Sequence, residues 1–411
     1  MIRIEILPQA EWILEELRKR GYEAFVVGGC VRDALLGRVP GDWDITTSAL
    51  PEETKQVFGR TVDTGIQHGT VTVIRDRAGY EVTTYRIDGE YEDGRHPKQV
   101  AFTRSLREDL LRRDFTINAM AYSHETGLVD MFGGLADLKA GRIRCVGDPR
   151  QRFTEDALRI LRAVRFSAQL DFAIEEGTRE ALAEFAPCLS RISRERIQAE
   201  LTKTLLSDHP QRMELVRETG MAPFVSETFP AAFRGAETSR FLEASRALPA
   251  GKAVRWAAFL APAGERDAVR ILRELKLDNE TIRTAGTLVS RVRDELPRGE
   301  GELRRLMSGL DDDTLELLLR LRAALFPEDA ARAEETRRAA AGVRARGECT
   351  ALRDLAVSGT DLLAAGFPPG PGLGRILNGL LQAVLEDPGR NKKETLLLLA
   401  GELSGREKQT G

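Results

Sequence analysis

The stretch FVVGGCVRDALLG, residues 25–37, and the GDWDI that follows it at 41–45 decide the fold of this chain. The apolar β-branched run predicts a strand, the Gly-Gly pair a tight turn, and residues 31–36 a short helix. A second strand is predicted at WDIT, residues 43–46. Glycines between a strand and a helix let backbone N–H groups approach a phosphate closely. The segment therefore indicates an α/β unit that binds a phosphorylated ligand.

Two aspartates, Asp42 and Asp44, lie one residue apart where the second strand is predicted. Alternate residues of a strand point to the same face, so both carboxylates are predicted to face one site. Two metal ions about 3.5–4 Å apart share carboxylate ligands placed in this way. An Asp-x-Asp sequence alone is more typical of a polar turn, but the preceding Gly-Gly turn favours metal-dependent chemistry on a nucleotide. We predict Asp42 and Asp44 as catalytic residues and metal ligands.

Two segments with arginines are candidates for the rest of a nucleotide site. Gly29 and Arg32, at the predicted helix start, are placed to contact a phosphate through the backbone and a guanidinium. In RRDFTIN, residues 112–118, Arg113 and its neighbours suit a grip on sugar and phosphate oxygens, because arginine offers a fork of donors to oxyanions. A surface ion pair explains this second segment equally well.

The segment RFTEDALRILRAVRF, residues 152–166, predicts an amphipathic helix with Thr154 as its N-cap. A carboxylate beside a guanidinium can read the Watson–Crick edge of a base, one accepting and the other donating. The alternative is a solvated helix face with ion pairs between residues three positions apart. The charged residues that step along this face are Asp156, Arg159, Arg162 and Arg165.

The composition is that of an ordinary soluble protein. With 411 residues, 42% of them hydrophobic and 30% charged, the chain suits roughly two to four domains. The net charge of −3 does not indicate a nucleic-acid binder, so a basic surface must be local. No secretion signal is evident and no apolar run reaches about 18 residues, so we expect a cytoplasmic protein without membrane contact. The 4 cysteines form no CxxC pair, which argues against a zinc site.

The character of the chain changes near residue 148. After it, leucine and alanine at helical spacing dominate, with Pro and Gly interruptions and no convincing strand. The sequence thus predicts an α+β fold class, with an α/β head followed by an all-α region. Before residue 148, strands are predicted at 24–29, 43–46, 70–74 and 80–87, and helices at 8–20 and 31–36.

Four segments follow one another in a fixed order. They are GGCVRDALLG with DWD, the stretch YRIDGEYEDGRHPKQVAFTRSLREDLLRRDFTINAMAY, the stretch DMFGGLADLKAGRIRCVGDPRQRFTEDALRILRAVRF, and LAVSGTDLLAAGFPPGPGLGRILNGLLQAVL near the end. In these motifs the chain resembles the class II tRNA nucleotidyltransferases, which comprise bacterial CCA-adding enzymes and their poly(A) polymerase relatives. The resemblance covers the head and the first helices after it almost without interruption.

The resemblance implies a seahorse-like architecture of four parts. They are a nucleotidyltransferase head with a small mixed sheet at 1–148, a neck that recognises the base at 149–206, a helical body at 207–298, and a helical tail that binds tRNA at 299–411. Body and tail would recognise the acceptor arm by shape and phosphate contacts. The candidate contacts are Arg191, Arg194, Arg196 and the turn 370–374. Solvated charges explain the arginines equally well, and a plain loop explains the turn.

Metal and phosphate binding are also implied by the resemblance. Asp42 and Asp44 would bind two Mg²⁺ ions, and Glu81 is a further candidate for a carboxylate near them. Gly29 and Arg32 would hold the phosphates of the nucleotide.

Selection of the base is implied for the residues further along the chain. Arg113 of the RRD motif would hold ribose and phosphate. Asp156 and Arg159 of the EDxxR motif would act as a protein template for CTP or ATP, and Arg162 and Arg165 match the arginines that follow this motif.

The implied activity is CCA addition to the 3′ end of tRNA from CTP and ATP, with release of pyrophosphate. The implied partners are tRNA, ATP and CTP, and not DNA. A CC-adding or A-adding specialist and a poly(A) polymerase are the enzymatic alternatives. The segment 88–98, associated in the family with the switch from C to A, looks intact and favours full CCA addition. A tRNA-binding protein without activity is the other alternative, against which the intact Asp42 and Asp44 argue.

Overall fold

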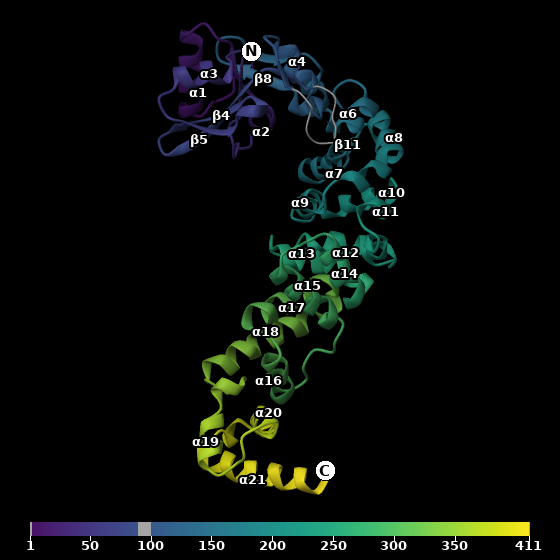
Figure 1. Cartoon of the computed structure of the whole chain (residues 1–411). Helices are drawn as coiled ribbons and strands as arrows, with labels where there is room; N and C mark the ends of the chain where they lie inside the picture. The colour runs from purple at the N-terminus through teal and green to yellow at the C-terminus, as the bar shows by residue number, and fades with distance from the viewer. Residues whose placement is uncertain (1, 89–99, 411) are drawn as a thin grey trace. The chain divides into compact units, whose positions relative to one another are not determined.

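The computed structural model describes residues 2–88 and 100–410, shown as a cartoon in Figure 1. The chain forms two compact units. Unit 1 runs up to residue 233 and takes in residues 270–277, and unit 2 comprises residues 234–269 and those from 278 on. The four predicted domains divide the chain more finely, and their boundaries stay predictions. The predicted switch segment lies outside the described residues from residue 89 on.

A seven-stranded mixed sheet underlies unit 1, as predicted. Its strand order is β3-β4-β5-β2-β1-β8-β9, and β2 and β5 are its parallel neighbours. Because β1 and β2 are antiparallel and buried at the centre, the chain that leaves β1 lies beside the chain that enters β2. The strands are β1 (Ala24–Val27), β2 (Ile45–Thr47), β3 (Thr61–Gly65), β4 (Thr70–Arg75), β5 (Ala78–Thr84), β8 (Met120–Ser123) and β9 (Gly127–Asp130).

The strand predicted at 80–87 is two strands in the structure. β5 ends at Thr84, and β6 (Arg86–Asp88) instead pairs with β7 (Val100–Phe102) in a separate two-stranded sheet. Tyr85, at the break, is fully buried in the apolar cluster under the central strands. Burial of this one large side chain fixes the chain at the point where β5 ends and β6 begins.

Short helices flank the sheet of unit 1. α1 buries one face, with apolar residues at the spacing of a helix in contact with the core. The predicted helix at 31–36 begins two residues earlier, at Gly29. The helices are α1 (Pro8–Lys19), α2 (Gly29–Leu35), α3 (Pro51–Val57), α4 (Leu106–Leu111) and α5 (Gly134–Lys139).

The rest of unit 1 is helical with one exception. β10 (Arg142–Ile143) pairs in parallel with β11 (Ala173–Ile174), a short strand in the region where none was predicted. Two-residue strands give too little periodicity to be recognised in a sequence. The helices are α6 (Pro149–Glu155), α7 (Leu158–Leu170), α8 (Glu176–Phe185), α9 (Arg194–Leu205), α10 (Glu214–Glu218) and α11 (Ala222–Val225).

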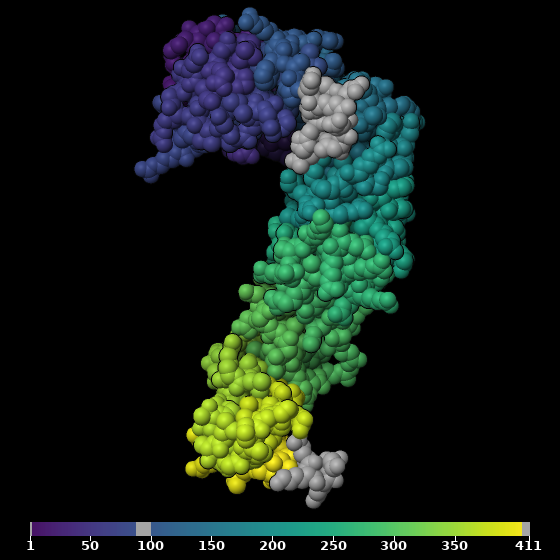
Figure 2. Space-filling model, in the orientation of Figure 1, coloured from purple at the N-terminus to yellow at the C-terminus, as the bar shows by residue number. Residues whose placement is uncertain are grey.

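The chain beyond residue 233 is helical throughout its described part. Apolar faces of α20 and α21 enclose one core cluster, and the space-filling view shows the C-terminal residues, in yellow, closely packed (Figure 2). No helix among those described has both the length and the apolar character to cross a membrane. The helices are α12 (Thr238–Ser245), α13 (Lys252–Leu260), α14 (Glu265–Glu274), α15 (Asn279–Arg291), α16 (Glu300–Ser308), α17 (Asp312–Leu325), α18 (Ala330–Ala345), α19 (Gly359–Ala364), α20 (Pro371–Glu386) and α21 (Lys393–Thr410).

Candidate active site

One open cleft of about 580 Å³ in unit 1 brings every predicted catalytic and nucleotide-binding residue together. Its walls come from the β1–α2 turn, the segment before β2, the segment after α4, and the helices α7 and α9. Positive side chains outnumber negative ones. The lining residues are Gly28, Gly29, Arg32, Asp42, Asp44, Arg112, Arg113, Asp114, Asn118, Asp156, Leu158, Arg159, Arg162, Arg165, Phe166, Arg196 and Lys203.

The turn after β1 needs glycine for two reasons. Gly28 has φ of 82°, in the left-handed region that residues with a Cβ rarely adopt. A Cβ there would also lie 2.9 Å from Nη1 of Arg113. The turn therefore lets the Arg113 guanidinium approach the start of α2, where Gly29 is the first helical residue.

Arg32 is buried in the first turns of α2. Its Nε and Nη2 donate to the two carboxylate oxygens of Asp33 at 2.9 and 3.0 Å, and its Nη1 donates to Oδ1 of Asn118 at 2.6 Å. The guanidinium also lies 5.1 Å from the centre of the Phe166 ring. These contacts hold its plane at the floor of the cleft.

The carboxylates of Asp42 and Asp44 lie in the segment that enters β2 and not on the strand itself, which begins at Ile45. The prediction that both lie on a strand was wrong. The backbone N–H of Val27 nevertheless donates to the carbonyl of Asp44 at 3.0 Å, so the pairing of β1 with β2 extends by one residue. That bond fixes Asp44 beside the glycine turn.

The acidic pair lies in an environment that disfavours negative charge. Surrounding protein atoms raise the pKa of Asp44 although its side chain keeps an exposed edge, Arg113 counteracts this, and Asp42 adds to it. Burial, Asp44 and Asp42 together raise the pKa of Glu81 on β5. Within the described residues, however, no three metal-ligating side chains stand close enough to hold one ion. Accumulated like charge of this kind is what a divalent cation would neutralise.

The RRD segment is held by buried carboxylates. Asp109 on α4 is fully buried; its Oδ1 accepts from Arg112 at 2.8 Å and its Oδ2 lies 3.5 Å from Arg113. Thr46 on β2 also donates to Asp109, at 3.1 Å. Burial would raise the pKa of Asp109, but the two arginines lower it. Sequence reasoning missed Asp109, although its spacing of three and four residues from the arginines was a usable signal.

Asp114 orients another arginine of the cleft. Its Oδ2 accepts from Nε of Arg162 at 2.7 Å, while Oδ1 accepts from Nδ2 of Asn118 at 3.1 Å. Burial would raise the pKa of Asp114, but Arg162 and Asn118 keep it well below its usual range. Asp114 therefore orients Arg162. Both of its carboxylate oxygens already accept hydrogen bonds from the protein.

The helix predicted from Thr154 onward is two helices with a break at Asp156. Thr154 lies inside α6, where its hydroxyl donates to the carbonyl of Arg150 at 2.8 Å, so its prediction as N-cap was wrong. Asp156 has extended backbone angles, and its Oδ1 accepts from the N–H of Leu158 at 3.0 Å. The carboxylate thus caps α7 and faces the cleft.

The four charged residues of this segment differ in their partners. Arg159 donates to Glu155 at 2.7 Å and to the carbonyl of Arg112 at 2.8 Å, and Asp156 bonds Arg196 instead of Arg159. Arg165 donates to Glu200 of α9 at 2.6 Å. The four side chains therefore do not form a solvated helix face, and they do not pair with one another.

The three other predicted contacts have different surroundings. Arg194 donates to the backbone carbonyls of Phe224 and Val225 and so ties α9 to α11. Arg191 is exposed outside the cleft, and the turn predicted at 370–374 is not a turn but the N-cap and first turn of α20, which begins at Pro371.

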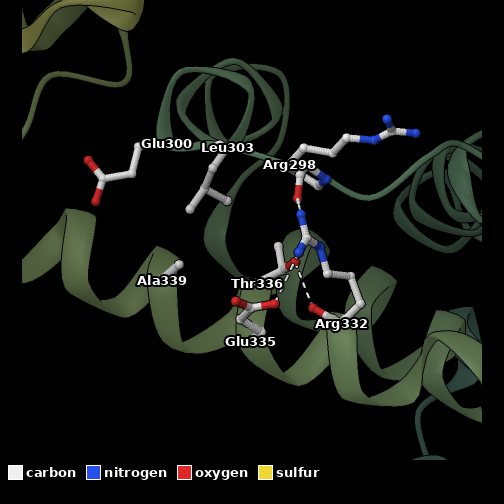
Figure 3. Close-up of a pocket in the computed structure, with 9 residues that line it drawn as sticks. Arg298, Glu300, Leu303, Arg332, Glu335, Thr336 and Ala339 are labelled. Atoms are coloured by element: carbon white, nitrogen blue, oxygen red, sulfur yellow. Dashed lines mark hydrogen bonds and ion pairs between the residues drawn. The ribbon is translucent and has the colours of Figure 1, made fainter.

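A smaller cavity of about 180 Å³ lies in unit 2 between α16 and α18 (Figure 3). Arg332 donates there to the carbonyl of Pro297 at 2.7 Å and lies 3.1 Å from Glu335, while Thr336 donates to the carbonyl of Arg332. None of the predicted site residues lines it. Its polar groups serve the packing of the two helices.

Comparison with known proteins assigns the chain to a family. A model of the poly A polymerase head domain matches residues 24–144, one of an RNA- and SrmB-binding site of polymerase A matches 171–231, and one of tRNA nucleotidyltransferase domain 2 matches 250–400. The CCA-adding enzyme of Geobacillus kaustophilus is 39% identical over 395 residues, 94% of this chain and 95% of that protein. That of Enterococcus faecalis is 40% identical over 400 residues, 95% of each chain. The chain belongs to the CCA-adding enzyme family.

Solved structures of CCA-adding enzymes share the fold. The Bacillus stearothermophilus enzyme in complex with CTP matches with a TM-score of 0.81 and 33% identity, over 98% of this chain and 100% of that one. The Thermotoga maritima enzyme complexed with tRNA has a TM-score of 0.65 at 22% identity, which speaks for the fold alone. The predicted class, a mixed-sheet head followed by helices, is confirmed.

CCA-adding enzymes are nucleotidyltransferases, a class of enzyme that uses divalent metal ions. The exposed, like-charged pair Asp42 and Asp44 fits such an ion, because hard cations take carboxylate oxygens.

Proposed function

We propose that this chain adds C, C and A in order to the 3′ end of tRNA, using CTP and ATP, without a nucleic-acid template. The observation that carries the proposal is a single cleft that holds the pair Asp42 and Asp44 together with Asp156 and Arg159. The first pair suits phosphoryl chemistry and the second suits reading a base. The two relatives compared above are named for the same activity.

Asp42 and Asp44 would hold two Mg²⁺ ions. When bound, the ions would lower the pKa of the primer hydroxyl and stabilise the pyrophosphate that leaves. Glu81 is close enough to both aspartates for their charges to raise its pKa, which supports a contact of Glu81 with the bound ions.

The arginines would bind and orient the triphosphate. Arg113 lies at the glycine turn, next to the first N–H groups of α2, and Arg32 lies one turn further on. Arg162 is oriented toward the cleft by Asp114. Guanidinium groups fixed beforehand stabilise the charge that develops on the departing phosphates without reorganisation. Arg165, which also lines the cleft and lies 4.1 Å from the centre of the Phe166 ring, would complete this set.

Asp156 and Arg159 would select the base. Cytosine and adenine both present an exocyclic amino donor, whereas uracil and guanine present a keto acceptor at the equivalent position. A carboxylate acceptor therefore matches C and A, and a guanidinium donor matches the neighbouring ring nitrogen. A small rotation of the base would allow one pair to serve both nucleotides.

A partial activity, CC or A addition, or poly(A) synthesis, is the alternative on the same fold. One of the matching family models is that of a poly A polymerase head. Full-length relatives named as CCA-adding enzymes favour complete CCA addition.

The test uses three tRNA transcripts: one without CCA, one without only the final A, and one complete. Each is incubated with the protein, Mg²⁺ and both CTP and ATP, one of them labelled. We expect two C and then one A on the first transcript, one A on the second and nothing on the third. Long A tails, C-only products or no incorporation would each contradict the proposal.

A further inference from the structure

Helix α9 contributes a wall of the cleft that lies beyond the motif-bearing segments. Arg196, Glu200 and Lys203 follow one another at intervals of four and three residues, so they share one face of α9. Arg196 and Lys203 line the cleft, and Glu200 holds Arg165. The face of α9 is thus part of the site, and Arg196 is its contact with the base-reading carboxylate.

Both oxygens of the Asp156 carboxylate accept a hydrogen bond from the protein. Oδ1 accepts from the N–H of Leu158 at 3.0 Å, and Oδ2 accepts from Nη2 of Arg196 at 3.1 Å. Asp156 stands at the break between α6 and α7, with φ of −141° and ψ of 101°. A side chain at such a break rotates more easily than one inside a helix. The second hydrogen bond, from Arg196, therefore helps to fix the orientation of the carboxylate.

Arg159 cannot be that anchor in this arrangement. Its Nη1 donates to the carbonyl of Arg152 and to Glu155, and its Nη2 donates to the carbonyl of Arg112. The two base-reading side chains are therefore oriented by separate partners. Asp156 depends on α9, and Arg159 depends on α6 and the segment after α4.

We propose that Arg196 is a positioning residue that sets the orientation of the Asp156 carboxylate and thereby the preference for CTP and ATP over UTP and GTP. The inference rests on the proposed function. Each carboxylate oxygen has two lone-pair sites, so one can accept from the protein while the other accepts from the amino group of the base. Without Arg196 the carboxylate rotates, and its acceptor direction toward the base is lost.

The location of the pair distinguishes it from a simple link between helices. Both side chains line the cleft and are about one-fifth exposed, with 22% and 18% of their surface accessible. A pair that served only to connect the break before α7 to α9 would add little to Arg165 and Glu200, which already bond between α7 and α9 at 2.6 Å. Arg165 and Glu200 therefore supply the structural link. The contact between Arg196 and Asp156 serves to orient the carboxylate.

The experiment compares R196M and R196K with R212M. R212M is the matched control, because Arg212 bonds Asp171 at 2.9 Å at the other end of α7, outside the cleft. The measured quantity is kcat/KM for CTP against UTP on tRNA without CCA, and for ATP against GTP on tRNA that ends in CC. R196M should lower both preferences by about tenfold or more, since a hydrogen bond to a charged group is lost. R196K should restore part of the preference, and R212M should leave it unchanged.

A double variant supplies the decisive result. In the D156A background, R196M should change the preference no further, because the group that it positions is absent. Equal loss of kcat/KM for all four nucleotides in R196M, or independent effects of R196M and D156A that multiply, would overturn the inference. Failure of the proposed function looks different: the unmodified protein would add no CCA, or D156A alone would leave the nucleotide preference intact.

Discussion

The two walls of the cleft and the carboxylates next to them hold their charges in opposite ways. On the sheet side, Asp42, Asp44 and Glu81 gather negative charge, and burial together with the neighbouring carboxylates raises the pKa of Asp44 and Glu81. On the helix side, buried Asp109 and Asp114 are matched by arginines, which lower their pKa values against the effect of burial. On the helix side, arginines of the protein balance the charge of the carboxylates. On the sheet side, a bound cation would balance it. Guanidinium donors that are already oriented, together with carboxylates that can bind a cation, suit phosphoryl transfer.

The largest expected effect comes from removing a charge on the sheet side. D44N should lower kcat for nucleotide addition by about a thousandfold or more, because a metal ligand is lost. Its melting temperature without metal should stay the same or rise, because the charged form of Asp44 is disfavoured in the folded protein. Single-turnover assays and thermal unfolding in EDTA measure the two quantities.

D63N is the control for this change, since Asp63 lies on β3 of the same sheet and pairs with Lys55 outside the cleft. It should keep full activity. If D44N kept more than about a tenth of the activity in Mg²⁺, a metal site at this pair would be refuted.

The helix side should respond in stability first. D109N leaves Arg112 and Arg113 without their buried partner and should cost about 3 kcal/mol of unfolding free energy at pH 7. Because the pKa of Asp109 is lowered in the folded state, its contribution is full above its unfolded pKa of about 3.9 and is lost as the pH falls through the folded value. Urea unfolding from pH 7 to pH 3 should therefore show a shallower acid loss in D109N.

D137N provides a comparison for D109N, because Asp137 is also buried and bonds Arg144, but away from the cleft. Both variants should lose stability, and D109N should in addition raise KM for CTP. Equal KM values in the two variants would show that Asp109 does not orient the cleft arginines.

A smaller effect is expected at the glycine turn that joins the two walls. G28A and G21A both place a Cβ at a positive φ, 82° and 86°, and should each cost about 1 kcal/mol of stability. In G28A the Cβ also meets Nη1 of Arg113, while around Gly21 nothing lies within 4 Å. G28A alone should raise KM for CTP and ATP. A matching rise in G21A would assign the effect to backbone strain.

The contacts that the sequence predicted lie on the sheet side of the site. The contacts that it missed lie on the helix side. The strand, glycine turn and acidic pair are consecutive in the chain, so local pattern predicted their meeting. The partners on the helix side come from distant segments: Asp114 meets Arg162, and Asp156 meets Arg196. Nothing in local spacing indicates such pairs.

The break at Asp156 was missed for the same reason. The periodicity of 152–166 fits one helix, but the side chains of Arg152 and Arg159 donate to the carbonyls of Leu111 and Arg112 at the end of α4. These tertiary bonds hold α6 and α7 on either side of the break, where Oδ1 of Asp156 accepts from the N–H of Leu158 in place of a helix carbonyl. Local propensity carries no record of them.

Glu81 gives the smallest and most discriminating effect, because it tests whether the sheet side extends beyond Asp42 and Asp44. Its raised folded pKa means that any stability it contributes is present below its unfolded pKa of about 4.3 and is lost as the pH rises. Without metal at pH 7, E81Q should therefore raise the melting temperature slightly, since a poorly placed charge on a partly exposed side chain is removed. With Mg²⁺ present the comparison reverses if Glu81 contributes to cation binding: the rise in melting temperature that Mg²⁺ gives should be smaller in E81Q than in the unmodified protein. An unchanged Mg²⁺ effect would confine the metal site to Asp42 and Asp44 and leave Glu81 as a charge that the fold merely tolerates.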